Sequence, residues 1–237
     1  MDLSGLLALL NLSLDLACLG GATYAAIAGT TKPHLPAKEK VEDAPSSSGK
    51  SSAKPNDFIS SLGLTKIERL VHVFLALAAL WHVRALTFHA VPLHAWIASG
   101  DRGRFRLACM LAMIGGAGRI WTYKELGHYF TFDLQVQKGQ KIIDTGPYAY
   151  VRHPSYTAIL VCMSGISLAI GPYGPGVPQF FRLPLMGVVG AAVVGTVLLI
   201  RKRCDDEERM FLLDEATGKP YFEYMKKVGQ RLWPNVY

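Results

Sequence analysis

The stretch FFRLPLMGVVGAAVVGTVLLI, residues 180–200, decides the fold class of this chain of 237 residues. It holds one charged side chain, Arg182, and about 20 predominantly apolar residues are what an α-helix needs to cross a bilayer. Four more apolar runs precede it, at residues 3–28, about 70–97, 107–123 and 156–170. The pattern predicts an all-α, polytopic integral membrane protein with about five transmembrane helices.

The composition favours a membrane protein over other classes. Hydrophobic residues make up 50% of the chain and charged residues 18%, whereas soluble domains carry about 25% charged residues. The net charge of +7 could indicate a nucleic-acid partner, but the basic residues cluster beside the apolar runs, which membrane topology explains better. The four cysteines are isolated, so neither a disulfide framework nor a zinc site is supported, and no metal is expected.

The basic residues also predict an orientation. Residues 30–69, 119–152 and 201–237 together hold 20 Lys and Arg, against four in the segments expected on the opposite side. The positive-inside rule places the three basic segments in the cytosol and the N-terminus outside. One of them contains EDAPSSSGKSSAKPND, whose composition predicts a flexible cytosolic loop over residues 30–57.

Two parts of the chain are therefore expected, an N-terminal set of helices at 1–123 and a C-terminal core at 124–237. In the core, GPYGPGVPQ predicts a tight turn between the last two apolar runs. That hairpin brings the polar segment 124–155 and the tail 201–237 to the same face, where they can build one site.

Smaller features of the runs predict how the helices pack. Gly187, Ala191 and Gly195 form a small-residue stripe that lets another helix approach closely. Asp15, the one acid of the first run, has to face a helix partner or water.

The stretch TGPYAYVRHPSY, residues 145–156, has two interpretations. In one, Gly146 and Pro147 turn the chain and His153-Pro154 starts a helix, whose free amide groups suit an electron-rich ligand. In the other, the tyrosines and Arg152 only anchor a membrane helix at the interface. Physics alone slightly favours the anchor, and the role of Arg152 stays open.

The stretch RKRCDDEERM, residues 201–210, raises the same question. Four consecutive acids beside an anionic membrane surface are unfavourable, so an anchor does not explain them. If the helix continues past residue 200, Arg203 and Glu207 share a face and can bind a ligand with charges of both signs. The simpler alternative is a solvated helix with charge pairs four residues apart.

Together these pieces resemble the isoprenylcysteine carboxyl methyltransferase family, within the integral membrane methyltransferases. The resemblance covers roughly residues 126–237 and rests on YFTFDLQVQKGQKIIDTGPYAYVRHPSY, a helical hairpin, RKRCDDEERMF and GKPYFEYMKKVGQRLWPNVY. It implies a multi-pass enzyme of the endoplasmic reticulum membrane with its site facing the cytosol. Such an enzyme uses S-adenosylmethionine to methylate the C-terminal carboxylate of a prenylated cysteine in CaaX-processed proteins.

The resemblance also implies roles for particular residues. Arg203 matches the substrate-binding arginine and, with Glu207, is the candidate catalytic residue. The residues expected to contact the cofactor are Gln135, Gln140, Lys141, Ile142, Ile143, Tyr148, His153, Pro154, Ser155, Tyr156 and Glu207.

Three rival functions share parts of this pattern. A phospholipid N-methyltransferase, which methylates phosphatidylethanolamine, would have the same cofactor site, but an amine nucleophile gains nothing from Arg203. A membrane sterol reductase has a comparable RHP…Y pattern, yet the Arg-x-x-x-Glu-Glu arrangement fits a methyltransferase better. A structural or receptor-like membrane protein would use its polar loops only as anchors.

Overall fold

The computed structural model describes residues 3–31, 64–87, 100–131, 134–175 and 177–233. Most of the predicted 30–57 loop and the end of the second apolar run lie outside these residues. The described part is all-α, as predicted, with no strand in these ranges. Its α-helices are α1 (Leu3–Thr30), α3 (Leu64–Thr87), α5 (Asp101–Leu126), α6 (Pro154–Ile170), α7 (Gln179–Leu213) and α8 (Gly218–Lys227), with short 3₁₀ turns η1 (Gly127–Tyr129) and η2 (Gly146–Ala149).

Each predicted apolar run falls on one of the first five helices. Among the described residues, two helices are long and apolar enough to cross a membrane, α1 over Leu7–Thr30 and α7 over Gln179–Leu213, and α6 is a shorter apolar helix. Membrane character is thus supported. The count of five spans stays a prediction, as does the orientation.

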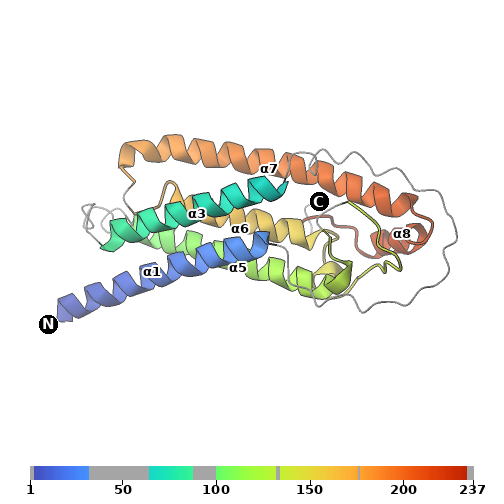
Figure 1. Ribbon diagram of the computed structural model, residues 1–237, viewed down its shortest axis with the longest axis horizontal. Helices are drawn as coiled ribbons and strands as arrows, with labels where there is room; N and C mark the ends of the chain where they lie inside the picture. Colours follow the sequence, from blue (N-terminus) through green and yellow to red (C-terminus); the bar gives the residue numbers. More distant parts are fainter. Residues whose placement is uncertain (1–2, 32–63, 88–99, 132–133, 176, 234–237) are drawn as a thin grey trace.

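Helix α6 runs antiparallel to both α5 and α7 along the long axis of the molecule (Figure 1). Consequently α5 ends, α6 begins and α7 ends at the same end of the bundle. Helix α8 and the C-terminal segment lie at that end too (Figure 1). The turn at 171–178 that reverses the chain between α6 and α7 is where the sequence predicted a hairpin.

Glycines in α5 and α6 allow these two helices to pack backbone against backbone. A Cβ atom at Gly115 would collide with the backbone of Cys162, and one at Gly165 with the backbone of Ala112. Gly116 packs in the same way against α1. The close approach expected at the stripe on α7 does not occur, because a Cβ at Gly187 or Gly195 would meet no atom within 4 Å in the described structure.

Ion pairs hold the opposite end of the bundle, where α5 begins. Asp15 is fully buried and accepts hydrogen bonds from Arg102 at 2.8 Å and Arg106 at 2.6 Å. The expectation that Asp15 faces a helix partner is confirmed. Helix α5 contains the apolar run 107–123 and begins before it, at Asp101, so Arg102 and Arg106 lie on the helix.

Candidate active site

Helix α7 carries the first pair of candidate residues beyond its apolar part. No proline lies between Pro184 and the end of the helix, so α7 continues without a break to Leu213. Arg203 and Glu207 are therefore one turn apart on the same face, as the sequence predicted for a continuing helix. Arg203 is 9% exposed, while the side chain of Glu207 keeps 29% exposure.

Helix α6 begins where the sequence placed it. His153 is the residue before the first turn and Pro154 occupies that turn, where its missing amide hydrogen costs nothing. The preceding turn η2 starts at Gly146, whose φ of 54° favours glycine. A Cβ there would also collide with the carboxyl group of Glu125.

The C-terminal segment docks against the start of α6. The amide of Arg152 donates to the carbonyl of Gln230 and the amide of His153 to that of Arg231, both at 2.9 Å. The hydroxyl of Thr157 donates to the carbonyl of Leu232 at 2.5 Å. The predicted meeting of the 124–155 segment with the tail therefore occurs.

Glu208 is the hub of this junction. Its carboxylate accepts hydrogen bonds from Arg152 at 3.0 Å and Arg231 at 2.7 Å, and lies 2.9 Å from Nε2 of His153. Burial would raise the pKa of Glu208, but the hydrogen bond and charge of His153, with the charge of Arg152 and the hydrogen bond of Arg231, lower it to about 2. The carboxylate is therefore ionised at any physiological pH.

Arg152 has a third role, different from both interpretations of its motif. Its side chain is 7% exposed, and besides Glu208 it binds the carbonyl oxygens of Val228 and Gly229, each at 3.0 Å. It ties the tail to the start of α6. A snorkelling anchor would instead leave its guanidinium in the interface.

A cavity of about 460 Å³ opens between α5, α6, α7 and the segment 129–143. Tyr156 links two of its charged groups, since its hydroxyl donates to Glu207 at 3.0 Å and accepts from Nε of Arg203 at 3.3 Å. Every residue of the predicted site lines this cavity except Pro154, which is buried beside it. Its apolar wall comes from Ile159, Met163, Leu199 and Ile200.

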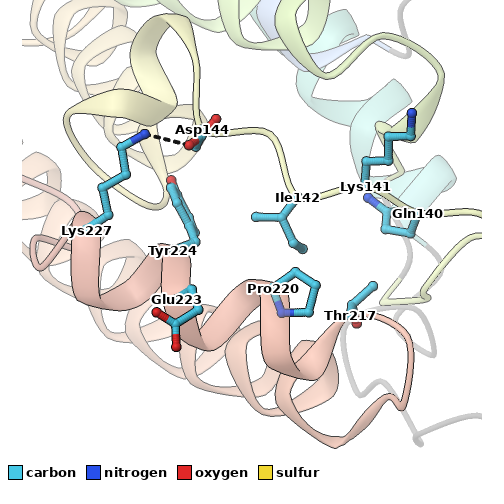
Figure 2. A pocket seen from close by; sticks show the side chains of 9 residues that line it. All are labelled: Gln140, Lys141, Ile142, Asp144, Thr217, Pro220, Glu223, Tyr224 and Lys227. Carbon is cyan, nitrogen blue, oxygen red and sulfur yellow. Dashed lines mark hydrogen bonds and ion pairs between the residues drawn. The ribbon is translucent and has the colours of Figure 1, made fainter.

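A second hollow of about 450 Å³ adjoins the first, between residues 140–144 and α8. Figure 2 shows Ile142 between the two walls and the ion pair of Asp144 with Lys227, at 2.6 Å, at one side. The hydrogen bond from Lys227 lowers the pKa of Asp144. Tyr224 lines both hollows and donates to the carbonyl of Tyr148 at 2.7 Å, so α8 holds Tyr148 in place.

Sequence reasoning missed Arg119, which also lines the cavity. This residue lies on α5, is 6% exposed, and donates from Nε to the carbonyl of Gly29 at 2.8 Å. Its Nη1 donates to the carbonyl oxygen of Ser155 at 2.9 Å and to the Ser155 hydroxyl. A signal was present, because a lone arginine within an apolar run marks a functional position by default.

No group of His, Cys, Asp and Glu that could hold a metal ion occurs among the described residues. The cavity instead combines guanidinium groups, one carboxylate, tyrosines and an apolar wall. Such a set suits a ligand that is both zwitterionic and lipid-like.

Comparison with known proteins gives one result. Residues 107–212 match the model of the isoprenylcysteine carboxyl methyltransferase (ICMT) family. No curated protein and no solved structure matches the chain. The matched segment begins before the region on which the sequence resemblance rested and ends before α8, but it contains the 145–156 and 201–210 motifs. Residues 107–212, which carry both motifs, are therefore similar to the isoprenylcysteine carboxyl methyltransferase family.

Proposed function

We propose that this protein transfers a methyl group from S-adenosylmethionine to the C-terminal carboxylate of a prenylated cysteine. The observation that carries the proposal is the cavity in which Arg203 and Glu207 face one another across Tyr156, beside an apolar wall from α6 and α7. A guanidinium suits the substrate carboxylate. The apolar wall suits its prenyl chain.

The residues present fit the cofactor. Glu207 is the one carboxylate among the described residues of the cavity, and its partial exposure leaves it able to face a cation. Residues 140–143 and Tyr148, which we name the cofactor segment, line the same cavity. When bound, S-adenosylmethionine supplies a methyl group whose bond to the sulfonium sulfur breaks as a bond to the carboxylate oxygen forms, with the electron pair staying on sulfur.

For this reaction the protein chiefly has to position the two reactants. The attacking carboxylate is already ionised at neutral pH, so no general base has to remove a proton. Arg203 orients the carboxylate, Tyr156 holds Arg203 and Glu207 in register, and the buried surroundings exclude water. Positioning of two reactants of this kind can contribute several kcal/mol.

We assign the protein to the endoplasmic reticulum membrane, with the cavity facing the cytosol and prenylated protein C-termini as its substrates. The basic segments that flank the cavity motifs support this orientation. The apolar wall of the cavity supports entry of the lipid chain from the bilayer.

The test is labelled methyl transfer to farnesylcysteine, geranylgeranylcysteine and phosphatidylethanolamine, each in the same vesicles with the purified protein. We expect label in the prenylcysteines and none in the phospholipid. Label in phosphatidylethanolamine alone would favour the N-methyltransferase. Oxidation of NADPH in place of methyl transfer would favour a sterol reductase, and failure to bind S-adenosylmethionine would favour a non-enzymatic membrane protein.

A further inference from the structure

Arg119 is a buried cation without a carboxylate partner in the described structure. The carbonyl of Gly29 and the two oxygens of Ser155 are neutral acceptors, and its guanidinium lies 5.0 Å from the centre of the Tyr123 ring. An unpaired charge at 6% exposure is costly unless an anion compensates it. Since Arg119 lines the cavity, that anion can come from a ligand.

The other permanent cations of the cavity differ in this respect. Arg152 is neutralised by Glu208, and Arg203 lies beside the Tyr156–Glu207 pair. Lys141 is exposed at the edge. Arg119 is thus the buried guanidinium that the described chain leaves without a counter-ion.

The geometry of Arg119 leaves one donor for a ligand. Nε and Nη1 are used by Gly29 and Ser155, whereas Nη2 has no hydrogen-bond partner among the described residues. Holding the group by two of its nitrogens fixes the direction of the third. The guanidinium is therefore oriented before any ligand arrives, which lowers the entropic cost of binding.

Arg119 and Glu207 act on the same part of the cavity. Burial raises the pKa of the Tyr148 hydroxyl, the charge of Glu207 raises it further, and the charge of Arg119 opposes them. Arg119, Glu207 and Tyr148 line the same cavity, so a cation and an anion are both available there. The methionyl end of the cofactor carries both an α-ammonium and an α-carboxylate, which is the complementary pair of charges.

We propose that Arg119 binds the α-carboxylate of S-adenosylmethionine, while Glu207 binds the α-ammonium and Arg203 is left for the carboxylate of the substrate. The assignment rests on the proposed function, whose reaction brings two carboxylates into one cavity. Two guanidiniums on different helices, α5 and α7, then keep the two carboxylates apart. Arg119 is a cofactor-binding residue. It directs the cofactor carboxylate to the α5 side of the cavity and leaves the α7 side to the substrate carboxylate.

The test measures binding, without turnover, of S-adenosylhomocysteine and of its decarboxylated analogue. It compares the unaltered protein with Arg119→Gln, Arg119→Lys and Arg203→Gln in the same micelles. We expect the unaltered protein to bind the decarboxylated analogue about ten- to a hundredfold more weakly. In Arg119→Gln the ratio of the two dissociation constants, decarboxylated analogue over S-adenosylhomocysteine, should fall to about one, with little change in affinity for the analogue. Arg119→Lys should keep part of it, and Arg203→Gln should keep all of it.

Four outcomes would overturn the assignment. If Arg119→Gln weakens both ligands equally, Arg119 only holds α1 and α6 in place. If the ratio collapses in Arg203→Gln instead, the two arginines have exchanged roles. If the unaltered protein binds both ligands equally well, the assignment is rejected. That result needs no variant, so it holds even if Arg119→Gln fails to fold. Absence of binding of either ligand would contradict the proposed function itself, and the assignment would fall with it.

Discussion

The two ends of the helical bundle both pair arginines with buried acids, but they differ in what those acids leave open. At the end where α5 begins, Asp15 and Asp101 are each 0% exposed and each is held by two arginines. At the other end Glu208 is held in the same way, yet its neighbour Glu207 keeps 29% of its side chain exposed to a cavity. Arginine–carboxylate pairing alone therefore does not identify a site. What identifies it is the charge left available beside a cavity.

The largest expected effect comes from Asp15→Ala, which removes the buried carboxylate that pairs with Arg102 and Arg106. Two arginines would lose their buried counter-ion, so we expect a loss of about 3–5 kcal/mol in the free energy of unfolding. Denaturation of the purified protein in micelles measures it. The affinity for S-adenosylhomocysteine of the folded protein should stay unchanged, because this cluster is at the far end. The control Asp206→Ala removes an exposed acid and should change stability little. A variant of normal stability would show that the cluster does not hold the bundle.

Next in size is the contrast between two arginines of α7, Arg203 and Arg182. We expect Arg203→Ala to lower kcat/KM for prenylcysteine methylation about 30- to 1000-fold, equivalent to about 2–4 kcal/mol. Arg182 pairs with Asp101 at 2.5 Å, at the end of the bundle where α5 begins. Arg182→Ala should lower stability but leave kcat/KM of the folded protein nearly unchanged. Equal kinetic losses in both variants would erase the difference between the two ends.

A smaller effect tests the packing that connects the ends. Gly115→Ala places a Cβ against the backbone of Cys162, which cannot move cheaply, so we expect about 1–3 kcal/mol of destabilisation. The matched variant Gly118→Ala would put its Cβ 3.4 Å from that of Ala158, an ordinary contact. It should be neutral or slightly stabilising, because alanine favours helix over glycine. Thermal unfolding of the two variants side by side measures the contrast, and equal midpoints would contradict close α5–α6 packing.

Per pH unit, the smallest effect is the pH dependence contributed by Glu208. Its pKa of about 2 in the folded chain lies below the usual value of 4.5, so falling pH protonates the unfolded chain first. The stabilisation is therefore complete above about pH 4.5 and is lost between about pH 4.5 and pH 2, by at most about 1.4 kcal/mol for each pH unit. Unfolding measured at pH 5 and pH 3 should show a difference between the unaltered protein and Glu208→Gln that shrinks at the lower pH. A constant difference would mean that Glu208 is not held as an ionised hub.

The periodicity and length of the apolar runs were enough to predict the helices. The apolar runs predicted the five long helices, because burial or membrane insertion of apolar side chains needs only local sequence. The first turn of α6 followed from His153-Pro154, and the shared face of Arg203 and Glu207 followed from their spacing. Membrane insertion of α3, α5 and α6 remains a prediction.

The remaining features depended on contacts between distant segments. The sequence left the role of Arg152 open, because no spacing rule connects it with Glu208 and the carbonyl groups of the tail that it binds. Arg119 sits in an apolar run, so its approach to Ser155 depends on how α5 packs on α6. The prediction from the small-residue stripe on α7 was wrong. It predicted a close neighbour for α7, while the glycines that are used for close packing lie on α5 and α6.

The central claim, that the open end of the bundle methylates a prenylcysteine carboxylate, is tested most directly by the chemical form of the product. Purified protein in vesicles is given methyl-labelled S-adenosylmethionine and farnesylcysteine, and the labelled product is then treated with mild base. We predict label in the farnesylcysteine fraction that base releases as methanol, because a methyl ester hydrolyses and an N-methyl group does not. Base-stable label in the phospholipid fraction, with none in farnesylcysteine, would contradict the account.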